Sequence, residues 1–230
     1  MSFLMRRGIQ SSGLVSAPEI PATIADLGLW LDADDGYTDK SGNSVVVTNN
    51  STTITNSALN GHDVFSIATG DISVPRLLAD DEFTIIFVLK SDGSTNKNSA
   101  LVCQHTGGID QGRFVIGPDN SSGELLKFFY NNGATQDNSS TSAAFDDTFR
   151  IVSITDNTGT SHANIDTGSN ESLATSQAWT PLNEPTRFGR TGSGLNQFVG
   201  EIASIIVYLR ALSDSERIQV EDFLSTRYAL

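Results

Sequence analysis

Short apolar runs alternate with clusters of Gly, Asn, Asp and Ser along most of this chain, and this pattern limits the possible folds more than any other feature. Such runs, bounded by turn-forming residues, are typical of β-strands joined by turns. The run at 83–89 is apolar at nearly every position, which predicts a central strand covered on both faces. The predicted strands are 29–31, 44–48, 64–67, 83–90, 100–104, 113–117, 125–130, 149–156, 161–166, 186–189 and 197–208.

The segments between and around these strands are predicted to be loops, one helix and an N-terminal arm. Four intervals almost free of aliphatic residues, 92–98, 117–123, 131–142 and 166–177, are predicted to be exposed loops. One helix is predicted near the C-terminus, where Ser213 and Glu216 have the spacing of a capping box and an apolar pattern follows. Residues 1–23 have no sustained period and are predicted to form an extended arm before one domain over residues 24–230.

Composition excludes several classes of partner. The chain has 230 residues, and its 27 acidic against 14 basic residues give a net charge of -13. Such a surface repels phosphate backbones and anionic lipids, so we expect neither a nucleic-acid nor a membrane partner. No apolar run approaches the ~20 residues that a membrane-spanning helix needs, and no signal peptide is recognisable. Cys103 is the only cysteine and is predicted to be buried, so no intrachain disulfide is expected.

No arrangement of residues points to catalysis. Glu201 stands alone on its predicted strand, where it should face solvent. His62, His105 and His162 are not at metal-ligand spacing, and no nucleophile elbow of the G-x-S-x-G type occurs. We therefore expect a protein that is not an enzyme, without catalytic residues, cofactor or metal.

The stretch at 198–217 resembles the end of a concanavalin A-like, laminin G-type domain. In that family a strand of the form F-x-G-x-I-x-x-I-x-V-Y leads through R-A-L-S into a short helix. Gly200 permits a bend or close approach, while Ile202, Ile205 and Val207 supply core-facing bulk. Residues 29–33 and 39–43 also resemble the opening strand and turn of bacterial and phage members. The resemblance implies an all-β fold: a two-sheet antiparallel jelly-roll sandwich of about six strands per sheet, with one short C-terminal helix.

Two candidate binding sites remain to be weighed, one from the resemblance and one from the aromatic residues. Laminin G-type modules bind calcium through loop carboxylates, so the acidic stretch between Asp32 and Asp39 is either a cation site or a solvated turn. Glucanases of the same superfamily use an E-x-D-x-E strand, which is absent. Aromatic faces can stack on sugars. Trp30 is predicted to be core, whereas Trp179, beside Pro181 in a polar segment, is the candidate carbohydrate-binding residue.

The N-terminus supplies a different kind of candidate site. An apolar and basic patch in this acidic chain is predicted to be a docking arm that orders on a larger assembly, and it consists of Phe3, Leu4, Met5, Arg6 and Arg7.

Likeness to phage structural proteins then suggests a non-enzymatic virion protein, either a head decoration or a fibre component. We expect it to be made in the host cytoplasm, to bind capsid or tail proteins, to form a homo-oligomer and to display a module for host-surface glycans. The alternative is a bacterial carbohydrate-binding module or adhesin domain. A hydrolase on the same scaffold is disfavoured by the missing carboxylate pair.

Overall fold

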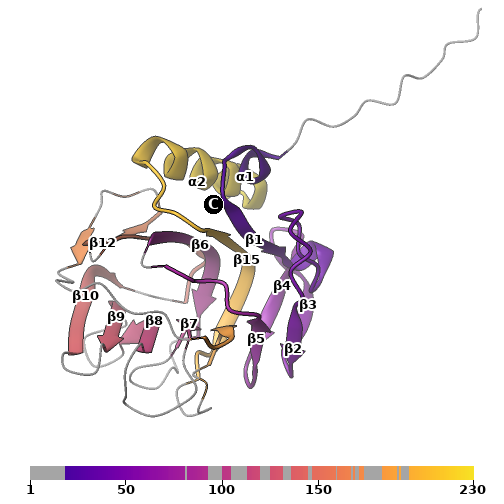
Figure 1. Ribbon diagram of the computed structural model, residues 1–230. Helices are drawn as coiled ribbons and strands as arrows, with labels where there is room; N and C mark the ends of the chain where they lie inside the picture. The colour runs from indigo at the N-terminus through magenta and orange to yellow at the C-terminus, as the bar shows by residue number, and fades with distance from the viewer. Residues whose placement is uncertain are drawn as a thin grey trace, which may run out of the picture.

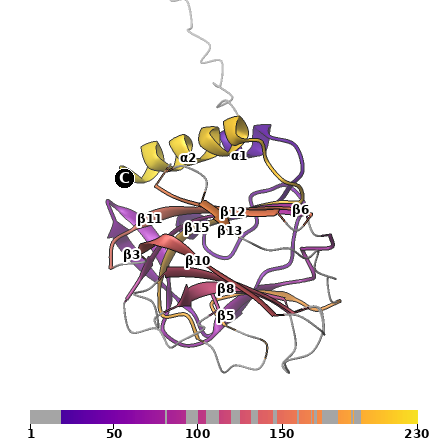
Figure 2. The same ribbon diagram turned by 90° about the vertical axis from the view of Figure 1, so that its left-hand side faces the viewer.

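Two antiparallel sheets stack face to face, and a long helix lies on the outer face of the first sheet (Figure 1 and Figure 2). The computed structural model describes residues 19–80, 82–92, 100–104, 113–119, 125–131, 136–144, 147–158, 160–166, 168, 171–173, 183–190, 192 and 197–230. Within 113–119, 125–131, 136–144 and 172–173 it describes the backbone alone. The predicted jelly-roll sandwich is confirmed.

Eight strands of the described chain form the first sheet, in the order β13-β12-β11-β6-β15-β4-β3 with β1 also paired to β15. Residues 200–202 of β15 pair with β4, and residues 204–208 of the same edge pair with β1. The strands are β1 (Leu27–Asp32), β3 (Thr53–Leu59), β4 (His62–Ile67), β6 (Glu82–Ser91), β11 (Arg150–Asn157), β12 (Thr160–Ile165), β13 (Glu171–Leu173) and β15 (Gly200–Tyr208).

Seven strands of the described chain form the second sheet, in the order β10-β9-β8-β7-β14-β5-β2. They are β2 (Thr48–Asn50), β5 (Asp71–Val74), β7 (Val102–Cys103), β8 (Arg113–Asp119), β9 (Leu125–Asn131), β10 (Gln136–Ala144) and β14 (Thr186–Phe188). Both sheets are thus larger than the six strands that the family resemblance implied. The helical segments are α1 (Ile20–Thr23), the 3-10 turn η1 (Ala33–Asp35) and α2 (Asp214–Tyr228).

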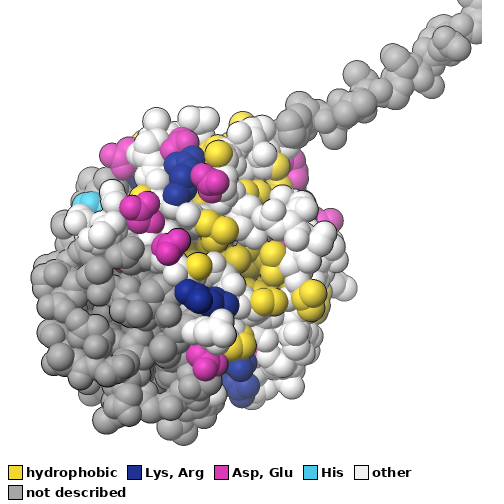
Figure 3. Space-filling model, in the orientation of Figure 1, with side chains coloured by type: hydrophobic (Ala, Val, Ile, Leu, Met, Phe, Trp, Pro, Cys, Tyr) yellow, Lys and Arg dark blue, Asp and Glu magenta, His cyan; other side chains and the backbone are white. Residues whose placement is uncertain are grey.

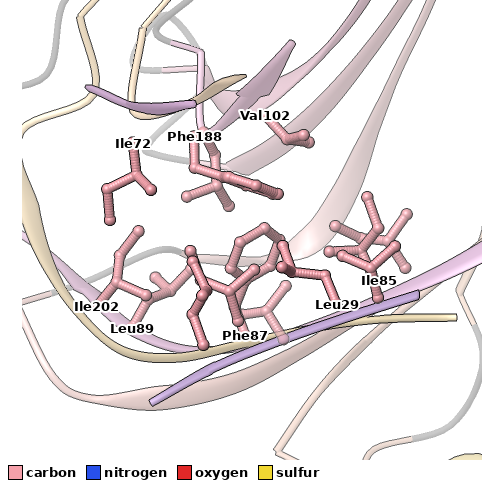
Figure 4. Packing of buried hydrophobic residues seen from close by; sticks show 14 of the residues in the cluster. Leu29, Ile72, Ile85, Phe87, Leu89, Val102, Phe188 and Ile202 are labelled. Carbon is pink, nitrogen blue, oxygen red and sulfur yellow. The ribbon is translucent and has the colours of Figure 1, made fainter. Parts of the chain in front are cut away.

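Strand β6 lies between β11 and β15 and is covered on both faces, as its apolar sequence predicts. Because side chains alternate along a strand, Phe87 enters the core between the sheets while Ile86 and Val88 face α2. Figure 4 shows Phe87 and its neighbours on the first sheet facing Phe188 and Ile72 of the second. The rings of Phe87 and Phe188 meet edge to face, with centroids 6.2 Å apart. One apolar cluster therefore joins the two sheets, and a second joins the first sheet to the helix that covers it.

Helix α2 begins as the sequence predicts, with Ser213 as N-cap and Glu216 completing the capping box. The Ser213 backbone N–H donates to Glu216 Oε2 at 3.0 Å, and Arg210 Nη2 donates to Glu216 Oε1 at 2.7 Å. In Figure 3, basic and acidic side chains lie side by side over the upper part of the molecule, where Figure 1 places α2. The first turn of α2 is thus fixed by charge-assisted hydrogen bonds.

These bonds make a testable contribution to acid stability. The hydrogen bond from Arg210, with those from Ser213, lowers the pKa of Glu216 from its ordinary 4.5 to about 2. A carboxylate whose pKa is depressed in the folded state stabilises the fold above the unfolded pKa, and this contribution is lost as the pH falls through the folded value. We expect Glu216→Gln to reduce the steepness with which the free energy of unfolding falls between pH 4.5 and 2. The effect should be small at this partly exposed site. Urea denaturation across this range measures it, and parallel curves for the two proteins would contradict it.

Several predicted element boundaries are wrong for identifiable reasons. Residues 44–47 of the predicted strand 44–48 are irregular, because Ser44 has a φ of 56° and the Val45 N–H donates to Asp39 Oδ2 at 3.0 Å. The predicted loop at 131–142 contains most of β10, and that at 166–177 contains β13. Both strands, like the unpredicted β3, lie at or near a sheet edge, where an apolar face is not required.

The end of the predicted arm is also folded. Residues 20–23 form the single turn α1, and the Tyr208 hydroxyl donates to the Pro21 carbonyl at 3.1 Å. Pro21 is buried, so residues from at least Ile20 belong to the body rather than to an extended arm. Residues 1–18 lie outside the described residues.

Candidate functional site

The acidic stretch between Asp32 and Asp39 is built around two cations of the same chain. Lys40 Nζ lies 2.8 Å from Asp35 Oδ2, and Arg227 Nη2 lies 2.8 Å from Asp32 Oδ2 and 3.1 Å from Asp34 Oδ2. Asp39 accepts hydrogen bonds from the backbone of Trp30, Ser41 and Val45. These carboxylates therefore fix the turn after β1 and tie it to the last turn of α2.

The pKa values of two of these carboxylates, Asp32 and Asp34, are shifted in opposite directions. Burial raises the pKa of Asp32 above its ordinary value, although Arg227 and Lys40 act in the opposite direction. Partial burial also opposes ionisation of Asp34. There, however, the hydrogen bonds from the Asp63 backbone and from His62 outweigh it, and the pKa of Asp34 is lowered. The arrangement is an ion-pair network within the chain, in which desolvation of Asp32 opposes the attraction of Arg227 and Lys40.

The other residues singled out from sequence are dispersed. Trp30 is core as predicted, with its ring edge to face with that of Phe223. Cys103 is buried, as predicted. Glu201 has 23% of its side-chain surface exposed and pairs with Lys90 at 2.9 Å. The docking-arm residues Phe3, Leu4, Met5, Arg6 and Arg7, the carbohydrate candidate Trp179, and His105 lie outside the described residues.

Three pockets lie along the first sheet in the described part of the chain. The smallest, of about 190 Å³, is at the ends of β4, β6 and β15 and includes the Lys90 and Glu201 pair. The next, of about 340 Å³, lies beside the start of α2 and is lined in part by Thr155 and Arg217. The third, of about 400 Å³, lies between the start of β11 and the last turn of α2 and includes Ser225. None of the three assembles the residues of a recognisable reaction centre.

An organised polar group lies on the outer face of the second sheet. We call it the Asp71 cluster, and it consists of Asp71, Asn50, Ser73, Arg187 and Arg190. Because Ile72 and Val74 of β5 face the core, Asp71 and Ser73 point to the opposite face of the sheet. Ser73 is directly paired with Arg187 of β14, and Asp71 with Asn50 of β2. Three strands therefore contribute to one polar surface.

Two guanidinium groups converge on one carboxylate in this cluster. Arg187 Nη1 lies 3.4 Å from Asp71 Oδ2, while Arg190 Nε and Nη2 lie 3.2 Å and 3.1 Å from the same oxygen. Asn50 Nδ2 donates to Asp71 Oδ1 and to Ser73 Oγ. Asp71 is fully buried, whereas 26% of the Arg187 side chain and 33% of the Arg190 side chain remain exposed. The site thus has two partly exposed arginine side chains held over a carboxylate that is hidden from solvent.

Sequence reasoning missed this site because its members are far apart in the chain. Asp71 precedes Arg187 by 116 residues. The available signals were weak: the alternation in Asp71-Ile72-Ser73-Val74, and the pair of arginines around Phe188-Gly189. Both are too short to stand out from the turn segments beside them.

The described residues supply two further observations. None of the helices that they form is long and apolar enough to cross a membrane. They bring together no group of three or more His, Cys, Asp or Glu side chains that could hold a metal ion.

The two-sheet sandwich has the fold of a lectin-type domain. Residues 67–216, about two thirds of the chain, match the family model for the concanavalin A-like lectin/glucanases superfamily. The chain therefore belongs to this superfamily, as the stretch around Gly200 suggested. A comparison with curated protein sequences finds no match.

Solved structures share the fold at low sequence identity. Domain 4 of AbnA, a GH43 extracellular arabinanase from Geobacillus stearothermophilus, in complex with arabinotriose, is 14% identical with a TM-score of 0.69, covering 86% of this chain and 98% of that chain. The binding domain of botulinum neurotoxin DC in complex with SialylT is 15% identical, with a TM-score of 0.63 and coverages of 91% and 53%. The binding domain of Paraclostridial Mosquitocidal Protein 1 is 17% identical, with a TM-score of 0.62 and coverages of 88% and 52%. This chain thus spans about half of the two toxin binding domains, and the likeness establishes the fold alone.

Proposed function

We propose that this chain is a non-catalytic glycan-binding module, displayed on a bacteriophage particle as a head decoration or fibre component. The observation that carries the glycan-binding part is the Asp71 cluster, where a buried carboxylate holds two partly exposed guanidinium groups on an outer sheet face. Sugar hydroxyls are good acceptors for such donors, and donors oriented in advance lose less entropy on binding. The similar domains solved with arabinotriose and with SialylT support this assignment.

Trp179 is the aromatic residue that we propose for stacking on a sugar ring. The apolar face of a pyranose ring can stack on an indole, which supplies contact area that hydrogen bonds lack. We expect Trp179→Ala to weaken binding to a glycan at least about tenfold, which is what the loss of ~1.4 kcal/mol or more of contact energy implies. Trp30→Phe is the matched control because Trp30 is buried in the core. Isothermal titration against a panel of host-surface polysaccharides measures the effect. Failure to bind any of them would refute the glycan-binding function.

Mounting on the particle is the proposed role of the N-terminal segment. Phe3, Leu4 and Met5 would bury apolar surface on a capsid or tail protein, while Arg6 and Arg7 would pair with its acidic groups. Several copies on one particle, or a homo-oligomer, would convert weak single-site glycan binding into strong avidity.

Deleting residues 1–18 tests this mounting role. We expect the shortened chain to keep its thermal unfolding transition and its glycan binding, but to lose attachment to particles. Co-sedimentation with purified particles and mass spectrometry of those particles are the measurements. Attachment that survives the deletion would refute the docking arm, and absence of the protein from particles would refute the virion role.

The alternative is a bacterial carbohydrate-binding module or adhesin domain. It is favoured by the likeness to the arabinanase domain, because the match covers 98% of that chain. Under this alternative Trp179→Ala still removes binding, but the protein occurs with bacterial cells rather than with particles. Release of reducing sugar from a polysaccharide panel would instead reveal a hydrolase.

A further inference from the structure

The Asp71 cluster concentrates positive charge in a chain whose net charge is -13. Among the basic residues whose side chains are described, most form an ion pair with at least one carboxylate apart from Asp71, namely Lys40, Lys90, Arg150, Arg210, Arg217 and Arg227. Arg187 and Arg190, in contrast, share Asp71 as their one ion-pair partner among the described residues. Two guanidinium charges against one carboxylate leave the cluster with an excess of one positive charge.

The excess charge faces outward. Asp71 has no exposed surface, while both arginine side chains are partly exposed above it. A ligand approaching this face therefore meets guanidinium groups and is shielded from the carboxylate that orients them. Guanidinium donors match the planar geometry of a carboxylate and bind it more strongly than they bind a neutral hydroxyl.

The backbone is shaped to bring the two arginines together. In a regular strand, residues 187 and 190 would point to opposite faces, because their separation is odd. Gly189 has a φ of 107°, which interrupts the alternation and lets Arg190 reach the same carboxylate as Arg187. A side chain at this position would be strained and would meet Ile67 Cγ2 at 2.9 Å. Only glycine therefore supports this paired arrangement.

From this geometry we infer that the Asp71 cluster recognises a carboxylate-bearing sugar residue, so that the module selects acidic over neutral glycans. The inference rests on the proposed glycan-binding function and narrows its ligand class. The sugar carboxylate accepts hydrogen bonds from Arg187 and Arg190 and neutralises their excess charge. Uronic acids and sialic acids share this chemistry.

Titration of the full chain with matched ligands tests this selectivity. The probes are trigalacturonate and 3′-sialyllactose, each beside its methyl ester, with lactose and a sulfated lactose as further ligands. We expect at least one acidic probe to bind. Its methyl ester should bind at least about tenfold more weakly, because a charge-assisted hydrogen bond is replaced by a neutral one. Binding of the acidic probe should also weaken as salt is raised.

Arginine variants identify the residues responsible. Arg187→Gln and Arg190→Gln should each lose the preference for the acid over its ester, whereas Arg187→Lys should keep part of it. Arg150→Gln is the matched control, because it removes a guanidinium paired with Asp166 on the other sheet. Thermal unfolding shows whether each variant is folded, and the comparison of acid with ester on the unaltered protein does not depend on any variant.

The outcomes separate the two proposals. Equal affinity for acid and ester, or tighter binding of lactose or sulfated lactose, would overturn the acidic-sugar inference and leave glycan binding standing. Absence of binding to every polysaccharide of the host panel and to every probe would overturn both. A double variant that carries both Arg187→Gln and Arg190→Gln should also lose the preference for the acid. If it kept that preference, the acidic sugar would be recognised elsewhere and the inference for this cluster would be overturned.

Discussion

Replacing Arg217 with methionine is expected to lower the free energy of unfolding by about 3–5 kcal/mol, the cost of leaving a buried charge without its partner. Arg217 is 5% exposed and Glu221 is 1% exposed, and both lie on the face of α2 that covers the first sheet. Arg217 Nη1 lies 2.6 Å from each oxygen of Glu221, which also accepts a hydrogen bond from Ser153 of β11. After the substitution, Glu221 would keep a hydroxyl donor but no counter-charge.

The double variant Arg217→Met/Glu221→Leu should recover most of that loss. Well-packed apolar residues often replace a buried ion pair at little cost, since they avoid its desolvation. Urea denaturation followed by circular dichroism measures the free energy of unfolding for the three proteins. Arg150→Gln serves as control, because exposed pairs contribute about 1 kcal/mol or less. A double variant as unstable as the single one would show that the loss comes from packing rather than from an unpaired charge.

Replacing Phe87 with alanine is expected to lower the free energy of unfolding by about 3–5 kcal/mol. Phe87 is fully buried in the middle of β6 and contacts Phe188 of the opposite sheet. The substitution removes apolar contact from both sheets at once and leaves a cavity that the paired strands cannot easily close. The loss should appear as a lower urea midpoint with an unchanged dependence on urea concentration.

An exposed apolar residue of α2 provides the comparison for Phe87. Ile218 is 41% exposed, so Ile218→Ala should change stability by only about 0.5 kcal/mol. A loss below about 1 kcal/mol for Phe87→Ala would mean that the two sheets do not depend on this contact, which contradicts the layered core.

Glycan selectivity and fold stability depend on different parts of the molecule. The Asp71 cluster lies on the outer face of the second sheet, whereas the Arg217 and Glu221 pair lies under α2 on the first. Changes to the cluster are therefore measurable as ligand selectivity, and changes beneath α2 as stability. The two sites lie on different sheets and share no partner among the described residues. Substitutions at the two sites should therefore make additive changes to the free energy of unfolding.

The strands and the helix could be predicted where the sequence has a local pattern, such as an apolar run or a capping box. The apolar run of β6 indicated a central strand, and Ser213 with Glu216 indicated where α2 begins. Strands such as β10 and β13 could not be predicted, because an edge or near-edge strand is stabilised by backbone pairing that leaves little trace in side-chain polarity. The irregular residues before β2 follow from the Asp39 side chain, which captures a backbone N–H that a strand would otherwise use.

By itself, the sequence determined the class of fold, the central strand and the capped C-terminal helix. These depend on interactions between residues close in the chain and on burial that a periodic pattern reveals. Only the tertiary structure decided that the Asp32 to Asp39 carboxylates pair with Lys40 and Arg227, and that Arg187 and Arg190 meet over Asp71. The physical reason is that ion pairing depends on distance in space, and the folded sheets bring these charges together across long stretches of chain.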